Sequence, residues 1–339
     1  MKDTKKIALV TGIFGQDGSY MAEYLLGLGY EVHGISREKH QGKLAESIES
    51  LTTIHYGDIK DQMFVDRVLE QTVFDEIYNF AAISDLGTAN KNPEETKKIN
   101  HDAVGFIFNK AIEVNPKVRL FQASSSQMFD TSVSPQNEDT QFVPRNVYAE
   151  TKIDAHNDFV VGLRKRGVFV CSGFLFNHES PRREDRFVTG KIAKTMTKIK
   201  LGLIDTPLEL GNMDMERDWG FAGDFVRAAH LMLQAKEPKD YVVATGKLHT
   251  VREFVEEGAR CLGLNISWKS EGIDEYGVDD SGKVIVKVNK DFYAPKETFK
   301  MVGDISKIKQ DLGWEPSVSF ESLVSMMIKN NLEELSVEN

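Results

Sequence analysis

A glycine-rich loop set between a strand and a helix limits the folds open to this chain of 339 residues more than any other feature. The apolar run Ile7–Thr11 predicts a short buried strand, and the apolar spacing that ends at Leu28 predicts a helix. Between them, glycines permit a tight turn and the close approach of a pyrophosphate, which the unpaired N–H groups of the first helical turn can bind. We therefore predict a dinucleotide-binding loop rather than an unliganded turn, with six residues in contact with the cofactor: Gly12, Phe14, Gly15, Gln16, Asp17 and Gly18.

Strand and helix patterns alternate at short intervals through the first half of the chain. This alternation predicts a parallel sheet with right-handed crossovers, that is, a doubly wound α/β fold of the Rossmann type. Ligands of such a sheet bind at the carboxyl ends of its strands. Five residues follow the predicted strands at 53–56 and 76–79, and we expect them to line the cofactor site: Asp58, Ile59, Phe80, Ala81 and Ala82.

Two domains are expected. Residues 1–176 should form the dinucleotide-binding domain, and residues 177–339 should mainly form a smaller C-terminal lobe that binds the substrate, with some return to the Rossmann core around 208–245. The polar, glycine-containing stretch 271–295 predicts a hairpin or flap within that lobe. The longer helices are expected at 93–114, 148–166, 222–234, 251–262 and 320–332.

The residues that follow the second strand bear on the choice of cofactor. A site for NAD usually has a carboxylate there, which binds the ribose hydroxyls and would repel a 2′-phosphate. This chain has Ser36, which is small and neutral, and Arg37, which can pair with a phosphate. We therefore predict NADP, although Glu38 leaves NAD open because its carboxylate could turn toward the ribose.

A tyrosine and a lysine four residues apart carry the predicted chemistry. On a helix, Tyr148 and Lys152 project from one face, so the ammonium can lie beside the phenol and favour its phenolate. Such a phenolate is a base for a sugar hydroxyl, and Ser125, at the preceding strand end, can hydrogen-bond the same oxygen. The spacing alone is weak, but together with the serine-rich strand end and the glycine loop it predicts an enzyme. We expect Tyr148 and Lys152 to contact the cofactor as well.

Cations gather in the second half of an otherwise acidic chain. The segment 177–191 is rich in arginine and ends at Lys191, and the sequence Arg217-Asp218-Trp219 repeats the theme. Together they predict a cradle for a diphosphate and a nucleoside. The alternative is a solvated charged loop.

Composition argues against several other classes of protein. Lys and Arg number 42 against 52 Asp and Glu, so the net charge of −10 would repel nucleic acid. No apolar run reaches membrane-spanning length, and a short charged leader precedes the first strand, so we expect a cytoplasmic protein without a membrane partner. The two cysteines and eight histidines lack the spacing of metal ligands, and no metal site is expected.

Six motifs spread over nearly the whole chain point to one family: Thr11-Gly-Ile-Phe-Gly-Gln-Asp-Gly-Ser-Tyr20, His55-Tyr-Gly-Asp58, Leu175-Phe-Asn-His-Glu-Ser-Pro-Arg-Arg183, Arg217-Asp-Trp-Gly220, Ala244-Thr-Gly246 and Val251-Arg-Glu-Phe254. They resemble the motifs of GDP-mannose 4,6-dehydratase, an extended short-chain dehydrogenase family. The resemblance implies bound NADP, with His178 beside it, and a GDP-hexose substrate. It also implies substrate contacts from ten residues: Ser84, Ser126, Asn177, Glu179, Arg182, Val188, Lys191, Gly211, Arg217 and Glu297.

The resemblance also implies a reaction, and one residue of this chain departs from it. In the family, a tyrosine takes the proton of the C4 hydroxyl as hydride leaves C4; a glutamate then removes the C5 proton and assists loss of the C6 hydroxyl, and hydride returns to C6. That glutamate is Gln127 here, and an amide cannot take up a proton. Because an acid–base group contributes roughly 10²- to 10⁴-fold in rate, elimination should be slow. We predict that Asp85 takes over this work, the alternative being that it caps the next helix.

Two more departures bear on assembly and on the nucleotide site. Ala294 replaces an arginine beside the nucleotide, and the loop 39–49 lacks the serine-rich segment with which the family reaches a neighbouring subunit's cofactor. We therefore expect a homodimer, formed through paired helices that include the one bearing Tyr148, while a tetramer remains open.

Three functions stay open at this point. The leading hypothesis is a 4,6-dehydratase-like enzyme that oxidises C4 of GDP-mannose or a related GDP-manno-sugar with NADP. Without water loss, the same first step would make it a C4 epimerase or C4 dehydrogenase of a GDP-hexose or GDP-heptose. From another class, it could be a non-catalytic cofactor-binding scaffold, although such proteins usually lose the counterpart of Tyr148 or Lys152.

Overall fold

The computed structural model describes residues 5–294 and 300–337. Two compact units share the chain, and each consists of three segments. Unit 1 comprises residues 1–176, 222–243 and 304–315, and unit 2 comprises residues 177–221, 244–303 and 316–339. The return to the first unit was expected over 208–245; the structure has it over 222–243 and adds a second return over 304–315.

Unit 1 is built on a seven-stranded sheet in which all neighbouring strands run parallel, in the order β11-β6-β5-β4-β1-β2-β3. The strands are β1 (Ile7–Thr11), β2 (Glu31–Ser36), β3 (Thr53–Tyr56), β4 (Glu76–Asn79), β5 (Arg119–Ser125), β6 (Val170–Leu175) and β11 (Tyr241–Val243). The strand order reverses between β1 and β4, which is where a doubly wound sheet opens a crevice for ligands. The predicted Rossmann-type sheet is confirmed.

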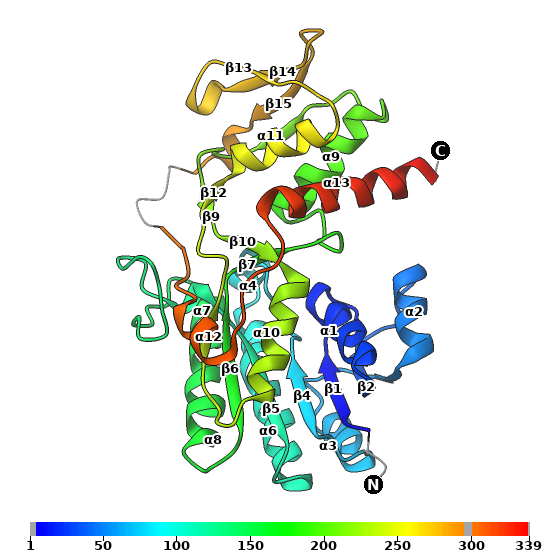
Figure 1. Ribbon diagram of the computed structural model, residues 1–339, viewed down its shortest axis with the longest axis vertical. Coiled ribbons are helices and arrows are strands. Elements are labelled where there is room, and N and C mark those ends of the chain that lie inside the picture. The colour runs from blue at the N-terminus through cyan, green and yellow to red at the C-terminus, as the bar shows by residue number, and fades with distance from the viewer. Residues whose placement is uncertain (1–4, 295–299, 338–339) are drawn as a thin grey trace. The chain divides into compact units, whose positions relative to one another are not determined.

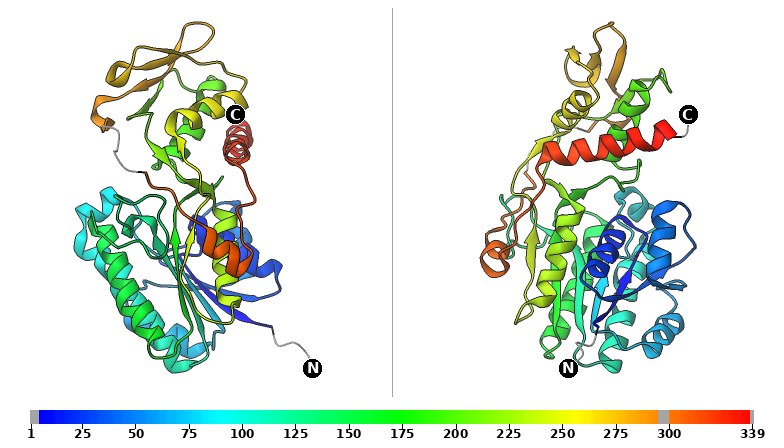
Figure 2. Two further views of the ribbon diagram at one scale, coloured as in Figure 1. Left: turned by 60° about the vertical axis from the view of Figure 1, so that its left-hand side comes forward. Right: turned by 45° about the vertical axis from the view of Figure 1, so that its right-hand side comes forward.

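Helices cover both faces of this sheet (Figures 1 and 2). One apolar core lies under α1 (Gln16–Gly27), α2 (Lys43–Leu51), α10 (Ala222–Gln234) and α12 (Ser306–Leu312). A second core lies on the opposite face, under α3 (Gln62–Gln71), α6 (Ala103–Val114), α7 (Val147–Ala155) and α8 (Gly162–Arg164). Two short helices, α4 (Leu86–Lys91) and α5 (Pro93–Lys97), complete this unit with the 3₁₀ turn η2 (Ser126–Met128).

Two of the long predicted helices contain π-helical turns. The turn η1 (Lys98–Asp102) separates α5 from α6, and η3 (His156–Val161) separates α7 from α8. A π-helical turn inside an α-helix often marks a functional site. Here η1 carries Asn100 and packs against α7, which carries the predicted tyrosine and lysine.

In its described residues, unit 2 combines small sheets with three helices around its own apolar core. The four-stranded sheet has the order β13-β14-β15-β8, and two further pairs are β10-β7 and β12-β9. Its strands are β7 (Asn177–Glu179), β8 (Leu208–Leu210), β9 (Glu216–Arg217), β10 (Trp219–Phe221), β12 (His249–Thr250), β13 (Ser267–Lys269), β14 (Tyr276–Val278) and β15 (Val284–Val288). Its helices are α9 (Val188–Lys200), α11 (Val251–Cys261) and α13 (Phe320–Val337), with 3₁₀ turns η4 (Gly272–Asp274) and η5 (Lys290–Phe292). The hairpin predicted within 271–295 is formed by β14 and β15.

Across 5–294 and 300–337, none of the helices has the length and apolarity needed to cross a membrane.

Candidate active site

The glycine loop between β1 and α1 has no room for side chains at its key positions. Gly12 has φ of 65°, and a Cβ there would lie 3.2 Å from the backbone of Ala81. A Cβ on Gly18 would lie 2.2 Å from the carbonyl oxygen of Gly12, and the N–H of Gly15 donates to that oxygen at 2.8 Å. Gln16, Asp17 and Gly18 then form the first turn of α1, whose N–H groups can bind an anion.

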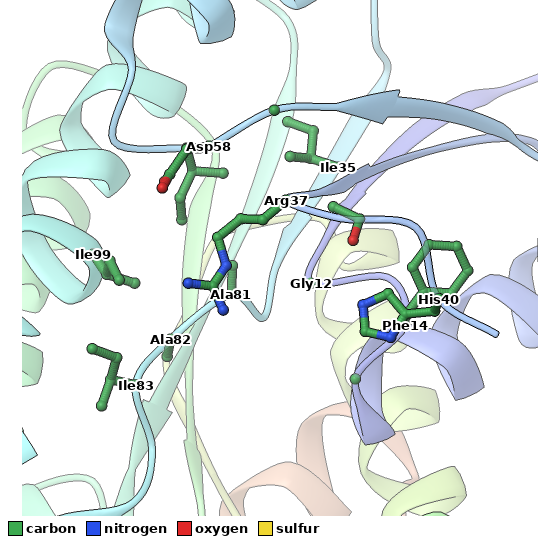
Figure 3. Close-up of a pocket in the computed structure, with 14 residues that line it drawn as sticks. Gly12, Phe14, Ile35, Arg37, His40, Asp58, Ala81, Ala82, Ile83 and Ile99 are labelled. Carbon is green, nitrogen blue, oxygen red and sulfur yellow. The ribbon is translucent and has the colours of Figure 1, made fainter. Parts of the chain in front are cut away.

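A pocket in unit 1 opens beside this loop at the carboxyl ends of β1 to β4 (Figure 3). Eight residues predicted to bind the cofactor line it: Gly12, Phe14, Gly15, Arg37, Asp58, Ile59, Ala81 and Ala82. Ser36, which was expected at the strand end beside the cofactor, lines it too, and so do five residues that were not predicted: Ile35, His40, Gly57, Ile83 and Ile99. Phe80, by contrast, packs beneath the strand ends, with its ring 5.6 Å from that of Phe121.

Polar groups in this pocket are held by their own loops. The Oδ1 of Asp58 accepts a hydrogen bond from the N–H of Lys60 at 3.0 Å. The hydroxyl of Ser36 donates to the carbonyl oxygen of Glu38 at 2.8 Å, which turns the segment after β2. The side chain of Arg37 extends into the pocket (Figure 3), whereas Glu38 does not line it.

The predicted tyrosine and lysine lie on α7, which Asn146 caps and which packs against η2 and the end of β5. Both side chains are buried. The ammonium of Lys152 donates to the carbonyl oxygen of Ala123 at 2.7 Å and lies 5.9 Å from the centre of the Tyr148 ring. Burial lowers the pKa of Lys152 from 10.5 to about 8, while the charge of Asp17 acts in the opposite direction. The ammonium and the Tyr148 ring thus lie near one another, and their catalytic roles stay a prediction.

The serine-rich end of β5 is also buried. The Oγ of Ser125 accepts a hydrogen bond from the N–H of Gln127 at 3.2 Å, which starts the turn η2 with Ser126. The neighbouring hydroxyl of Ser124 points the other way in the strand and lies 2.6 Å from that of Ser172. The side chain of Gln127 is half-buried.

Asn100 joins three parts of this site, a role that the sequence analysis missed. Its Oδ1 accepts from the N–H of Ile83 at 2.9 Å, and its Nδ2 donates to the carbonyl oxygen of Ile83 at 3.0 Å. The same Nδ2 lies 3.4 Å from the hydroxyl of Thr151 on α7. Asn100 is fully buried, and a polar side chain at a position where a helix faces its core was the available signal.

Asp85 caps a helix. Its Oδ1 accepts hydrogen bonds from the N–H of Thr88 at 2.7 Å and from the Thr88 hydroxyl at 2.6 Å, at the start of α4. The alternative considered for Asp85 is therefore present in the structure. Ser84, one residue earlier, is exposed.

In unit 2, Glu179 holds the loop that leads into α9. The carboxylate is buried, accepts from the hydroxyl of Thr189 at 2.6 Å and pairs with Arg183 at 2.8 Å. The N–H of Arg182 donates to the hydroxyl of Ser180 at 3.1 Å within the same loop. These bonds fix the first turn of α9, which Val188 begins, so its unpaired N–H groups have a set position.

Lys191 and Gly211 both lie next to Phe292 in unit 2. The ammonium of Lys191 lies 4.6 Å from the centre of the Phe292 ring. A Cβ on Gly211 would lie 2.3 Å from the carbonyl oxygen of Phe292, so only glycine fits there. The structure thus brings two predicted substrate residues together with Phe292, which sequence reasoning missed because no local pattern links residues so far apart.

Asp218 has a structural role within the sequence that was predicted to bind phosphate. It is buried and accepts bonds from the N–H and hydroxyl of Thr245, at 2.8 and 2.6 Å, and from the N–H groups of Gly246 and Gly303, at 2.9 and 3.2 Å. Its neighbour Arg217 lies on β9 and donates to the carbonyl oxygen of Glu216 at 2.7 Å.

The remaining predicted residues of this half are placed as follows. Asn177 and His178 lie on β7, paired with β10, and both are half-buried. Glu297 lies outside the described residues. Within the described ranges, no group of three or more His, Cys, Asp or Glu side chains could hold a metal ion.

Comparisons with known proteins agree on one family. The family model for GDP-mannose 4,6 dehydratase matches residues 9–327. GDP-mannose 4,6 dehydratase 2 of Arabidopsis thaliana is 41% identical over 345 residues, covering 98% of this chain and 88% of that protein. The GDP-mannose 4,6-dehydratase of Vibrio cholerae serotype O1 is 39% identical, covering 97% of this chain and 94% of that protein.

Solved structures extend the likeness in fold. The UDP-glucose 4-epimerase of Thermotoga maritima, solved with UDP-glucose, superposes with a TM-score of 0.80. It covers 97% of this chain and 99% of that chain at 20% sequence identity. At this identity, the likeness speaks for the fold alone.

Proposed function

This chain belongs to the GDP-mannose 4,6-dehydratase family of extended short-chain dehydrogenase enzymes, and we propose that it oxidises C4 of a GDP-linked sugar of the manno type. The observation that carries the proposal is the bond from the Lys152 ammonium to the carbonyl oxygen of Ala123. It fastens the helix of Tyr148 to the strand end that carries Ser125, two residues further on. The phenol of Tyr148, the ammonium of Lys152 and the hydroxyl of Ser125 are therefore carried by two segments that this bond joins.

NADP is the proposed cofactor, and the chain's own residues fit it. A Cβ at Gly12 or Gly18 would fill the space against the loop, as expected where backbone must approach a pyrophosphate. Arg37 and Ser36, rather than a carboxylate, line the pocket after β2. When bound, NADP supplies the acceptor for the hydride of C4.

The proposed first step is a proton transfer to Tyr148. The phenolate oxygen takes the proton of the C4 hydroxyl, and the hydroxyl of Ser125 hydrogen-bonds the same substrate oxygen. Lys152 stabilises the phenolate by its charge, which it can do only while it is protonated. Because burial lowers the pKa of Lys152 to about 8, the cation is present at neutral pH and is lost in mildly alkaline solution.

The later elimination is the step at which this chain should differ from its relatives. Gln127 stands where the family has a glutamate, and its amide cannot accept the C5 proton. Water loss is therefore slow or absent, and in its absence the product is that of a C4 epimerase or C4 dehydrogenase.

Asp85 is the proposed substitute for the missing acid–base group. Asparagine caps a helix as well as aspartate does, but it cannot transfer a proton. Asp85→Asn should therefore keep the free energy of unfolding and slow water loss. Unchanged product and rate would leave Asp85 with its capping role alone.

The nucleotide part of the substrate is proposed to bind unit 2. The first turn of α9 offers N–H groups to a diphosphate, and cationic side chains nearby can add hydrogen bonds. We assign contacts with GDP to Asn177, Glu179, Arg182, Val188, Lys191, Gly211 and Arg217, and contacts with the sugar to Ser84 and Ser126. His178 is assigned to the cofactor, and Glu297 to the nucleotide by family resemblance.

We also propose a homodimer in the cytoplasm. Phe106 of α6 and Phe159 of η3 line one groove together with polar residues, and these helices are the pair through which a second copy would bind. The two cysteines are free thiols, which suits a reducing compartment. Light scattering of the purified protein tests the dimer, with a tetramer as the competing result.

Product mass tests the proposed function. Purified protein is incubated with NADP and either GDP-mannose or a GDP-heptose, and the products are weighed. A product lighter by one water identifies a dehydratase, an unchanged mass with altered stereochemistry identifies an epimerase, and loss of two hydrogens identifies a dehydrogenase. Tyr148→Phe is the matched control and should form none of them. If NADP and GDP-sugar both bind but none of these products forms and no transient reduction of NADP is seen, the protein is a scaffold and the proposal fails.

A further inference from the structure

We propose that His40 is a second ligand, beside Arg37, for the adenosine 2′-phosphate of NADP, and that it sets the preference for NADP over NAD. This inference rests on the proposed function, which makes NADP the cofactor. It concerns a residue to which the sequence analysis gave no role.

Both side chains line one pocket and come from one short segment. Arg37 and His40 follow β2, at the strand end where a dinucleotide site contacts the adenosine ribose. The hydrogen bond from Ser36 to the carbonyl oxygen of Glu38 turns this segment, and Figure 3 shows Arg37 and His40 on either side of the space beside Gly12.

His40 is exposed, and one face of its imidazole lies against the ring of Phe14. The ring centre of Phe14 lies 4.8 Å from that of His40, at an angle of 35° between the ring planes. This contact joins the segment after β2 to the glycine loop, which is the part of the site that receives the pyrophosphate. His40 thus belongs to the segment after β2 and also contacts the glycine loop through Phe14.

The charges of the pocket favour an anion at this point. Among the described residues that line it, Asp58 is the single acid, and it lies 3.4 Å from the ammonium of Lys60. The neighbouring cation Lys39 points elsewhere, with its ammonium 3.9 Å from the carboxylate of Glu49. Arg37 and His40 remain as the basic side chains that line the pocket.

An imidazole suits a phosphate in either charge state. A ring N–H donates to a phosphate oxygen when the ring is neutral, and protonation adds a charge to the same bond. NAD has no phosphate at this position, so a bond from His40 would strengthen the binding of NADP alone.

Cofactor binding by full-length variants tests the inference. Dissociation constants are measured by fluorescence for NADPH and NADH and by calorimetry for 2′,5′-ADP and 5′-AMP, which differ in the same phosphate. His40→Leu should raise the dissociation constants of NADPH and 2′,5′-ADP by about tenfold, which corresponds to the loss of one hydrogen bond to a charged group. The dissociation constants of NADH and 5′-AMP should change less than about twofold, since only the contact with the 2′-phosphate is removed. His40→Arg should restore the preference.

Lys39→Gln is the matched control, since it removes a neighbouring cation that does not line the pocket, and it should leave all four constants unchanged. Equal weakening of NADPH and NADH in His40→Leu, or no weakening of either, would overturn the inference while GDP-sugar oxidation by the unmodified protein persists. Failure of the unmodified protein to bind either cofactor would overturn the proposed function with it.

Discussion

At the scale of single residues, the buried ammonium of Lys152 links catalysis to pH. Burial favours the neutral amine and lowers the pKa from 10.5 to about 8. The native state therefore binds the proton of Lys152 more weakly than the unfolded chain does. The protonated lysine predominates below pH 8, where it can support the Tyr148 phenolate, and the neutral amine predominates above that pH.

The rate of C4 oxidation should accordingly fall above about pH 8 as the ammonium of Lys152 loses its proton. Single-turnover reduction of NADP, measured between pH 6 and pH 10, provides the profile. Lys152→Arg carries a charge over this whole range, so its rate should be lower but should not show the alkaline fall. An alkaline fall of the same midpoint in Lys152→Arg would assign it to another group.

Gln127 offers a second prediction at this scale. Gln127→Glu restores a group that can accept the C5 proton, so water loss should accelerate by roughly 10²- to 10⁴-fold. The preceding C4 oxidation should keep its rate, because Ser125, Tyr148 and Lys152 are untouched. Rapid-quench mass spectrometry measures the two steps separately. Equal water loss in both proteins would show that another residue already performs the elimination.

At the scale of elements, the π-helical turn η1 places Asn100 where three segments meet. The extra residue of a π-turn shifts the helix face, and here it turns an amide toward the backbone of Ile83. Ile83 belongs to the strand-end segment that lines the cofactor pocket, and Thr151 belongs to the catalytic helix. The side chain of Asn100 therefore links the segment of Ile83, which lines the cofactor pocket, to the helix that carries Tyr148.

Removing that side chain should affect both stability and cofactor binding. Asn100→Ala leaves the N–H and carbonyl of Ile83 without their buried partner, at a cost of about 2–4 kcal/mol in the free energy of unfolding. NADPH should bind more weakly because Ile83 lines the pocket. Urea denaturation and fluorescence titration measure the two effects. Lys98→Ala, an exposed change on the same π-helical turn, should alter neither; loss of stability in both variants would point to the helix rather than to the bond.

Local sequence patterns predicted the alternating strands and helices of unit 1 and the family, and both predictions are confirmed. They could be predicted because a glycine loop and a strand each depend on residues that are adjacent in the sequence. Partners at long range were not predicted. Asp218 lies in a sequence predicted to bind phosphate, and in the structure its carboxylate holds a loop, because its donors include residues 245 and 303. The substrate contact of Glu179 stays a prediction, and the bond that its carboxylate accepts from Thr189 was not foreseen. A pattern shows that a strand exists near 241–243, but register with β6 decides which sheet it joins.

At the scale of the whole molecule, the two units cannot be separated by one cut in the chain. The core on one face of the unit 1 sheet includes Phe225, Met232 and Tyr241 from the first return and Trp314 from the second. The fragment 1–176 would leave that apolar face in water.

A fragment of residues 1–176 should therefore not fold cooperatively, although it contains the glycine loop and the Tyr148 helix. We expect a broad thermal transition by circular dichroism, strong binding of a hydrophobic dye and no measurable affinity for NADPH. The full-length chain is the control. A sharp transition together with NADPH binding by the fragment would show that the returning segments are dispensable.

Asp218 stabilises the chain where it passes between the two units. Thr245 and Gly246 begin the stretch by which the chain leaves the first return, and Gly303 ends the stretch that leads into the second. The carboxylate of Asp218 thus accepts hydrogen bonds from two connecting segments that are almost sixty residues apart in the sequence. Loss of that carboxylate would loosen both connections together, so a residue with no assigned contact to cofactor or sugar would affect every segment that those connections join.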